Sequence, residues 1–148
     1  MQHDSILITL ADDDEDDRLF FTDAFDELKI NTIVNTVNNG KELLNYLNDP
    51  DTILPNILFL DLNMPILNGI ECLKEIKSND KFKDIVIAIY STSSSDQDVE
   101  DTFVLGANIY IKKPSNFDSL KKILANIITI NWQYHTSGLN KDTFLLRV

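Results

Sequence analysis

Five short runs of β-branched and aliphatic residues alternate along the chain with five segments whose apolar residues recur at helical spacing. A short continuous apolar run is typical of a strand buried on both faces, and an apolar residue every three or four positions is typical of an amphipathic helix. The runs span residues 6–11, 32–37, 57–60, 85–90 and 109–112, and the helical segments lie at about 16–29, 43–47, 70–76, 95–105 and 116–130. Regular βα alternation predicts a parallel sheet with helices on both faces and right-handed crossovers.

Size and charge limit the classes of protein to consider. The chain has 148 residues, which is enough for one domain around a single core. Its formal net charge is −11, and residues 1–30 hold ten acidic side chains against two basic ones. Such an acidic end repels nucleic acid and anionic membranes, so we expect neither as a partner.

The only cysteine is Cys72, which excludes an internal disulfide and any cysteine-based metal cluster. A reducing compartment fits best, and we expect the protein to be cytoplasmic. The apolar run at residues 6–11 is too short for the core of a signal peptide, and no segment reaches the length of a membrane span.

Polar residues of complementary kinds follow four of the five predicted strands. Asp12 and Asp13 follow the first, Asp61 the third, Ser91 the fourth and Lys113 the fifth. In a parallel α/β sheet, ligands bind where these strand ends meet. Carboxylates that converge there repel one another, so a divalent cation is their natural partner, and an all-oxygen site with water suits Mg²⁺.

The ammonium of Lys113 and the hydroxyl of Ser91 suit a phosphoryl group instead of a cation. A carboxylate between a cation and a lysine is suited to attack phosphorus, which makes Asp61 the candidate nucleophile. Taken alone, the acidic run has an ordinary explanation as a helix start, Ser91 as a turn residue and Lys113 as a surface lysine, whereas a buried carboxylate at Asp61 needs a partner. The combination favours a site. A calcium loop is excluded because Asp17 and Asp23 stand where that loop requires Gly and Glu.

Five separated motifs of the chain resemble the response-regulator receiver domain. Asp61 precedes Ser91 by 30 residues and Lys113 by 52, which are the intervals typical of that family. The resemblance covers about residues 5–130 and leaves a tail at 131–148. The motifs are Leu-Ala-Asp-Asp-Asp at 10–14, Asp-Leu-Asn-Met-Pro at 61–65 with a glycine at 69, Ser-Thr-Ser-Ser at 91–94, Gly-Ala at 106–107, and Tyr-Ile-Lys-Lys-Pro at 110–114.

This resemblance implies a flavodoxin-like, doubly wound α/β fold, with five parallel strands in the order 2-1-3-4-5 and five helices. It implies a signalling protein of a two-component phosphorelay, in which Asp61 accepts a phosphoryl group from a histidine kinase or a phosphotransfer protein. Asp13, Asp61 and the backbone carbonyl of Asn63 would bind Mg²⁺ directly, and Asp12 would bind it through water. The chain would be no enzyme beyond its own phosphorylation and dephosphorylation.

The resemblance also assigns a switch. Ser91 and Lys113 would contact the phosphoryl oxygens, and Tyr110 would change its rotamer on phosphorylation. The surface of the fourth helix, fifth strand and fifth helix would then bind a downstream protein. The peptide before Pro114 is expected to be cis. The acidic run extends past the usual pair, so the metal acids are either Asp12 and Asp13 or a pair shifted by one residue, and Ser91 stands where Thr is common.

Two alternatives remain open. A small phosphatase of the haloacid-dehalogenase type also combines a nucleophilic Asp, a hydroxyl, a Lys and Mg²⁺. That family places Asp-x-Asp-x-Thr or Val on the first strand, whereas this chain has an acid, Asp16, at the last position. The other alternative is a degenerate receiver that serves only as a scaffold, although every key position is filled.

The tail at 131–148 fits neither a sixth strand nor a long helix. Its aromatic residues and its Phe-Leu-Leu run differ from the polar composition of flexible ends. We expect partial order, with Trp132, Tyr134 or Phe144 packed against this domain or a second copy, in a monomer or a homodimer. Disorder of the tail is the alternative.

Overall fold

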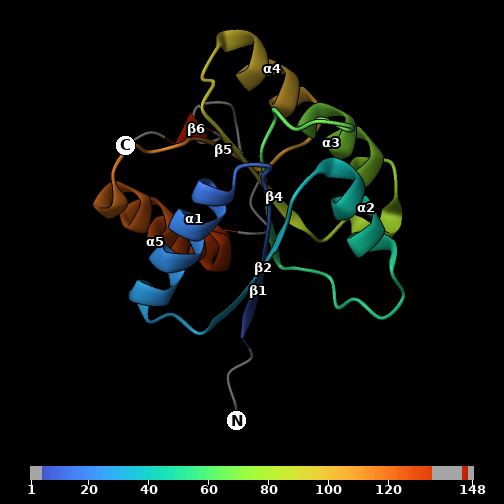
Figure 1. The fold of residues 1–148 in the computed structure, drawn as a ribbon. Coiled ribbons are helices and arrows are strands. Elements are labelled where there is room, and N and C mark those ends of the chain that lie inside the picture. Colours follow the sequence, from blue (N-terminus) through green and yellow to red (C-terminus); the bar gives the residue numbers. More distant parts are fainter. Residues whose placement is uncertain (1–4, 135–144, 147–148) are drawn as a thin grey trace.

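Strands and helices alternate in the computed structural model, which describes residues 5–134 and 145–146, with side chains as far as residue 129 (Figure 1). The strands are β1 (Ile6–Ala11), β2 (Thr32–Val37), β3 (Ile57–Leu60), β4 (Val86–Ser91), β5 (Ile109–Lys112) and β6 (Leu145–Leu146). The helices are α1 (Glu15–Leu28), α2 (Gly40–Asn48), α3 (Gly69–Lys77), α4 (Asp96–Val104) and α5 (Phe117–Tyr134), with a 3₁₀ turn, η1, at Asp80–Phe82.

The first five strands form a parallel sheet in the order β2-β1-β3-β4-β5, which confirms the expected flavodoxin-like topology. The order reverses direction between β1 and β3, so the crevice above their carboxyl ends is the topological switch point. Leu60, the last residue of β3, is paired with Ala11 of β1 and with Ile89 of β4. Asp61 therefore leaves the sheet between the ends of its two neighbouring strands.

Helices cover both faces of the sheet, with α1 and α5 on one side and α2 and α3 on the other (Figure 1). Successive side chains of a strand point to opposite faces, and β3 supplies apolar residues to both. Phe59 meets Phe21 of α1 edge to face, with ring centroids 4.9 Å apart, whereas Leu58 belongs to the core that contains Leu43 of α2 and Leu73 of α3. Burial on both faces fixes the strand that carries Asp61.

Capping side chains set where the helices start. The Asp14 carboxylate accepts the backbone N–H of Asp17, so α1 starts at Glu15, slightly before the predicted start at residue 16 or 17. Asn68 and Glu71 form a reciprocal capping box at the start of α3. These caps fix the two helix starts that flank the crevice.

The C-terminal segment differs from expectation. Helix α5 continues to Tyr134, and β6 pairs in parallel with β5, Leu145 opposite Tyr110, so the expectation that the tail forms no sixth strand was wrong. Without β6, β5 would be an edge strand with unpaired backbone groups, and a short leucine pair can cover such an edge. The backbone of Trp132 lies in α5, Phe144 lies outside the described residues, and the packing of the tail aromatics stays a prediction.

The expected cis peptide before Pro114 was also wrong. The bond is trans, the isomer that proline-preceding peptides favour by about 0.5–1 kcal/mol in the absence of other constraints. Over the part of the chain that the structure describes, no helix is both long and apolar enough to cross a membrane.

Candidate functional site

A cluster of polar side chains lies at the carboxyl ends of β1, β3, β4 and β5. Asp12 and Ser91 are fully buried, and Asp61 is only 5% exposed, while Asp13 is open to solvent. Buried polar groups are costly unless they are paired, so this concentration at one edge of the sheet indicates a site.

Asp12, Asp13 and Asp61 form the acidic part of the cluster. One carboxylate oxygen from each lies within 4.8 Å of the others. Asp12 Oδ1 accepts the backbone N–H of Asp14 over 3.0 Å, and its buried Oδ2 forms an ion pair with the Lys113 ammonium at 2.8 Å. Three converging carboxylate oxygens fit a hard divalent cation such as Mg²⁺.

Lys113 supplies the positive charge of the cluster. Its Nζ lies 2.8 Å from Asp12 Oδ2, 2.8 Å from Asp17 Oδ2 and 3.6 Å from Asp61 Oδ2. The ammonium also lies over the ring of Tyr90, 5.3 Å from its centroid. The lysine is therefore shared among three carboxylates and is held at the closest distance by two of them.

Burial and charge shift the protonation of these groups. Burial raises the pKa of Asp61 to about 6; the Lys113 charge opposes this shift and the Asp12 charge adds to it. Burial also raises the pKa of Asp12. Burial alone would lower the pKa of Lys113, but Asp12 and Asp17 outweigh it, so that pKa lies above its usual value. At neutral pH the site thus holds a charged lysine beside a carboxylate that is ionised but poorly solvated.

The loop that follows β3 is folded tightly against Asp61. The backbone N–H of Asn63 donates to Asp61 Oδ1 over 3.3 Å, and the N–H of Gly69 donates to the carbonyl of Leu62 over 3.0 Å. A Cβ atom at Gly69 would lie 2.3 Å from the backbone oxygen of Asp61, so only glycine permits this approach. The glycine of the motif thus sets the position of the acceptor loop.

The loop that follows β4 links Ser91 to Tyr110 of β5 through hydrogen bonds to Ser93. The Ser91 hydroxyl accepts the N–H of Ser93 over 3.1 Å, and the fully buried Tyr110 donates its hydroxyl to the Ser93 carbonyl over 2.8 Å. The Ser93 hydroxyl donates to Asp98 at 2.6 Å, which links the same loop to α4. Ser91 and the aromatic side chain of β5 are therefore connected through one residue.

Comparison with known proteins decides the family. Residues 8–125 match the family described as "Response regulator receiver domain". The chain belongs to this family. Receiver domains carry an acidic pocket, and this chain has an acidic cluster of Asp12, Asp13 and Asp61.

Two of the relatives are a probable regulatory protein and a response regulator. The receiver is 29% identical over 127 residues to the probable methanogenesis regulatory protein FilR2 of Methanothrix harundinacea, covering 84% of this chain and 82% of that protein. It is 38% identical over 73 residues to the response regulator Rcp1 of Synechocystis sp., covering about half of each protein: 49% of this chain and 50% of Rcp1.

Solved structures of response regulators share the fold. The phosphorylated cyanobacterial phytochrome response regulator RcpA matches with a TM-score of 0.80 and 30% identity, over 90% of this chain and 98% of that one. The Mn²⁺-bound form of Rcp1 matches with a TM-score of 0.76 and 27% identity, over 90% and 98% of the two chains.

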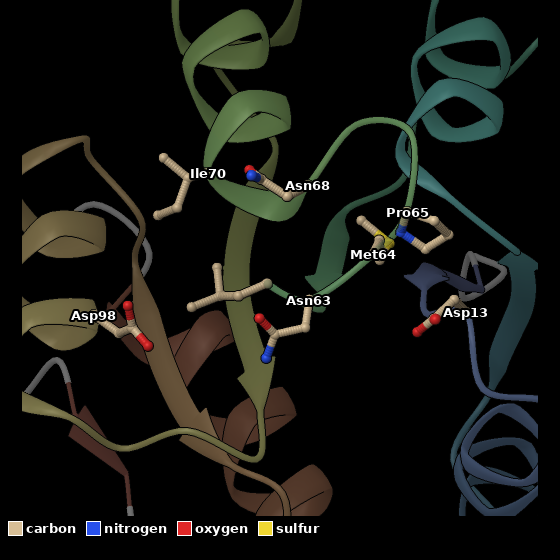
Figure 2. A pocket seen from close by; sticks show the side chains of 8 residues that line it. Asp13, Asn63, Met64, Pro65, Asn68, Ile70 and Asp98 are labelled. Atoms are coloured by element: carbon tan, nitrogen blue, oxygen red, sulfur yellow. The ribbon is translucent and has the colours of Figure 1, made fainter.

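An open pocket lies beside the acidic group of the receiver. Figure 2 shows Asp13 and Asp98 on opposite sides of it, with Asn63 between them. Its volume is about 600 Å³, and Met64, Pro65, Asn68, Ile70 and Leu62 complete its lining. Of the three clustered carboxylates, Asp13 is the one that lines this pocket.

The structure divides the sequence-predicted site residues into two neighbouring groups. Asp12, Asp13, Asp61 and Lys113 form one cluster, while Ser91 and Tyr110 belong to the adjoining loop network. Asp14 caps α1 and lies outside the group of three carboxylates.

Sequence reasoning missed the contact between Asp17 and Lys113. Its signal was the length of the acidic run, which continues past the usual pair into the first turn of α1. That signal could not identify the member of the run that reaches the lysine, because this depends on where the helix starts.

Proposed function

We propose that the protein is a phosphorylatable receiver of a two-component phosphorelay, with Asp61 as the phosphoacceptor. The Asp61 carboxylate attacks the phosphorus of a phosphohistidine on a histidine kinase or phosphotransfer protein. The P–N bond breaks, its electron pair stays on the imidazole, and an aspartyl phosphate forms. The reaction is a signal transfer and involves no turnover of a small substrate.

The observation that carries this proposal is the position of Asp61. It is almost completely buried at the end of the central strand, close to the Lys113 ammonium and to the carboxylates of Asp12 and Asp13. Its pKa, raised to about 6, leaves it ionised at neutral pH, and its poor solvation favours it as a nucleophile. RcpA was solved in a phosphorylated form, which supports the proposal that this receiver can be phosphorylated.

Asp12, Asp13, Asp61 and the backbone carbonyl of Asn63 would hold Mg²⁺. When bound, the cation supplies positive charge that offsets the repulsion between an anionic donor and the acidic group. Rcp1 was solved with Mn²⁺, a cation of similar ligand preference, which supports a divalent ion in this chain.

Lys113 and Ser91 are proposed to contact the phosphoryl oxygens once they are in place. The ammonium lies 3.6 Å from Asp61, so it needs only a small shift to reach an oxygen added there. The loop network through Ser93 is proposed to carry the change to Tyr110, and so to the α4, β5 and α5 surface that a downstream protein would bind.

Residues 5–130 are proposed as the receiver domain, followed by a C-terminal segment at 131–148. We place the protein in the cytoplasm because its one cysteine, Cys72, is a free buried thiol, which suits a reducing compartment. Whether it acts as a monomer or a homodimer is to be measured by sedimentation.

Incubation with acetyl phosphate and Mg²⁺ separates the proposed function from its rivals. A receiver adds one labile phosphoryl group per chain, which intact-mass measurement detects. A haloacid-dehalogenase-type phosphatase would instead release phosphate steadily from a phosphoester such as p-nitrophenyl phosphate. A degenerate receiver would do neither.

A further inference from the structure

The Lys113 ammonium lies 0.8 Å closer to Asp17 than to the proposed acceptor, at 2.8 Å and 3.6 Å. We propose that Asp17 is a positioning residue that holds this ammonium toward α1 and so competes with Asp61 for it. The inference rests on the proposed function, because it concerns how readily the lysine reaches a phosphoryl group on Asp61.

The position of Asp17 is fixed by the start of α1. Its backbone N–H donates to the capping carboxylate of Asp14 over 3.1 Å. The next residue, Arg18, donates from its guanidinium to the backbone carbonyl of Asp12 over 2.8 Å. The first turn of the helix is thus tied to the end of β1, and the Asp17 carboxylate is held beside the crevice.

Several groups surround the Lys113 ammonium and determine where its three N–H protons point. Asp17 accepts one of them in a 2.8 Å hydrogen bond, and the Asp12 carboxylate forms an ion pair at the same distance. The ring of Tyr90 limits the ammonium on another side, 5.3 Å from its centroid. Asp61 at 3.6 Å lies beyond ordinary hydrogen-bond distance, so the lysine is directed away from it.

Phosphorylation would place new anionic oxygens on Asp61 and reverse this preference. Lys113 must then give up part of its contact with Asp17, and that loss subtracts from the stabilisation of the phosphoryl group. Because the Asp17 side chain is about one-third exposed, its ion pair with Lys113 is partly solvated and therefore only moderately strong. Removing it should therefore ease phosphorylation without abolishing the site.

The variants Asp17→Ala and Asp16→Ala test the inference. Both remove one negative charge from the first turn of α1, but Asp16 is exposed and serves as the matched control. With acetyl phosphate and Mg²⁺, we expect Asp17→Ala to be phosphorylated about two- to fivefold faster than Asp16→Ala, the range expected for a partly exposed ion pair. Simple damage to the fold would slow the reaction, so an acceleration identifies positioning.

Crystal structures of the wild type and of Asp17→Ala, without metal or phosphodonor, provide the second readout. We expect Lys113 Nζ to move within hydrogen-bond distance of Asp61 in the variant. An unmoved ammonium, or a rate equal to that of Asp16→Ala, overturns the inference. If the wild type takes up no phosphoryl group, the proposed function fails instead, and the crystal structures still decide where Asp17 holds the lysine.

Discussion

The hydroxyl of Tyr110 donates a 2.8 Å hydrogen bond to the backbone carbonyl of Ser93, two residues after Ser91. Because Ser93 N–H is in turn bound by the Ser91 hydroxyl, a movement of Ser91 pulls on the group that holds the buried tyrosine. The proposed switch thus has a short physical path from the strand end to β5.

Replacing Ser91 by Ala should leave Asp61 open to phosphorylation but uncouple it from Tyr110, because the hydroxyl that would follow the phosphoryl oxygens is gone. Loss of the hydrogen bond to Ser93 should also cost about 1 kcal/mol of unfolding free energy. Amide hydrogen exchange around Tyr110, measured with and without acetyl phosphate, checks this, and Ser94→Ala in the same loop is the control. An equal phosphorylation response in Ser91→Ala and wild type would place the switch elsewhere.

Asp13→Ala and Asp14→Ala should affect different properties, the first Mg²⁺ binding and the second stability. Asp13 belongs to the group of three carboxylates, so its removal should weaken Mg²⁺ binding most, as measured by calorimetric titration. Asp14 caps α1, so its removal should leave Mg²⁺ affinity nearly unchanged and cost about 1 kcal/mol of unfolding free energy. A larger loss of affinity in Asp14→Ala would shift the metal acids by one residue.

Asp61→Asn should stabilise the metal-free protein at neutral pH. Burial raises the pKa of Asp61 from 3.8 to about 6, so ionising it costs folding free energy. The favourable contribution of the protonated Asp61 carboxyl to the unfolding free energy is complete below about pH 4 and is lost as the pH rises through 6. At pH 7.5 in EDTA we expect the unfolding free energy of Asp61→Asn to exceed that of wild type by about 2–3 kcal/mol, because a pKa difference of one unit corresponds to about 1.4 kcal/mol.

Urea unfolding at pH 7.5 and at about pH 4 checks this difference, which should shrink at the lower pH because Asp61 is then protonated in the folded state and no longer carries a buried charge. A gap of the same size at both values would mean that the stabilisation does not come from the carboxylate charge.

Truncation after Tyr134 removes β6 and should expose the edge of β5. The backbone of Leu145 and Leu146 pairs with Tyr110 and Ile111, so the amides of β5 should exchange faster in the truncated chain. Strand β2, at the other edge of the sheet, provides an internal control. Unchanged exchange in β5 would show that this pairing contributes no protection.

Much of the fold follows from the sequence because the strands are buried. The apolar run at residues 57–60 has no polar position to place at a surface, and it forms β3 with the predicted bounds. Strand β4 was predicted one residue early, since Ser91 pairs with Lys112 and so extends the ladder past Tyr90. Pattern alone cannot determine how far a ladder of hydrogen bonds continues.

The candidate site was predictable where residues follow strands directly, as with Asp12, Asp61 and Lys113. It was not predictable where a helix brings a side chain back to the crevice, as with Asp17, because this depends on the capping of α1 by Asp14. The pairing of β6 with β5 was missed for a similar reason. Two leucines carry almost no periodicity, and only the open edge of β5 makes them a strand.

Mapping the phosphorylated residue tests the central claim most directly. After incubation with acetyl phosphate and Mg²⁺, peptide mass spectrometry should locate one phosphoryl group on Asp61. EDTA should prevent the modification, and Asp61→Asn should abolish it. Modification that persists undiminished in Asp61→Asn, or that maps to Ser91, would contradict the account.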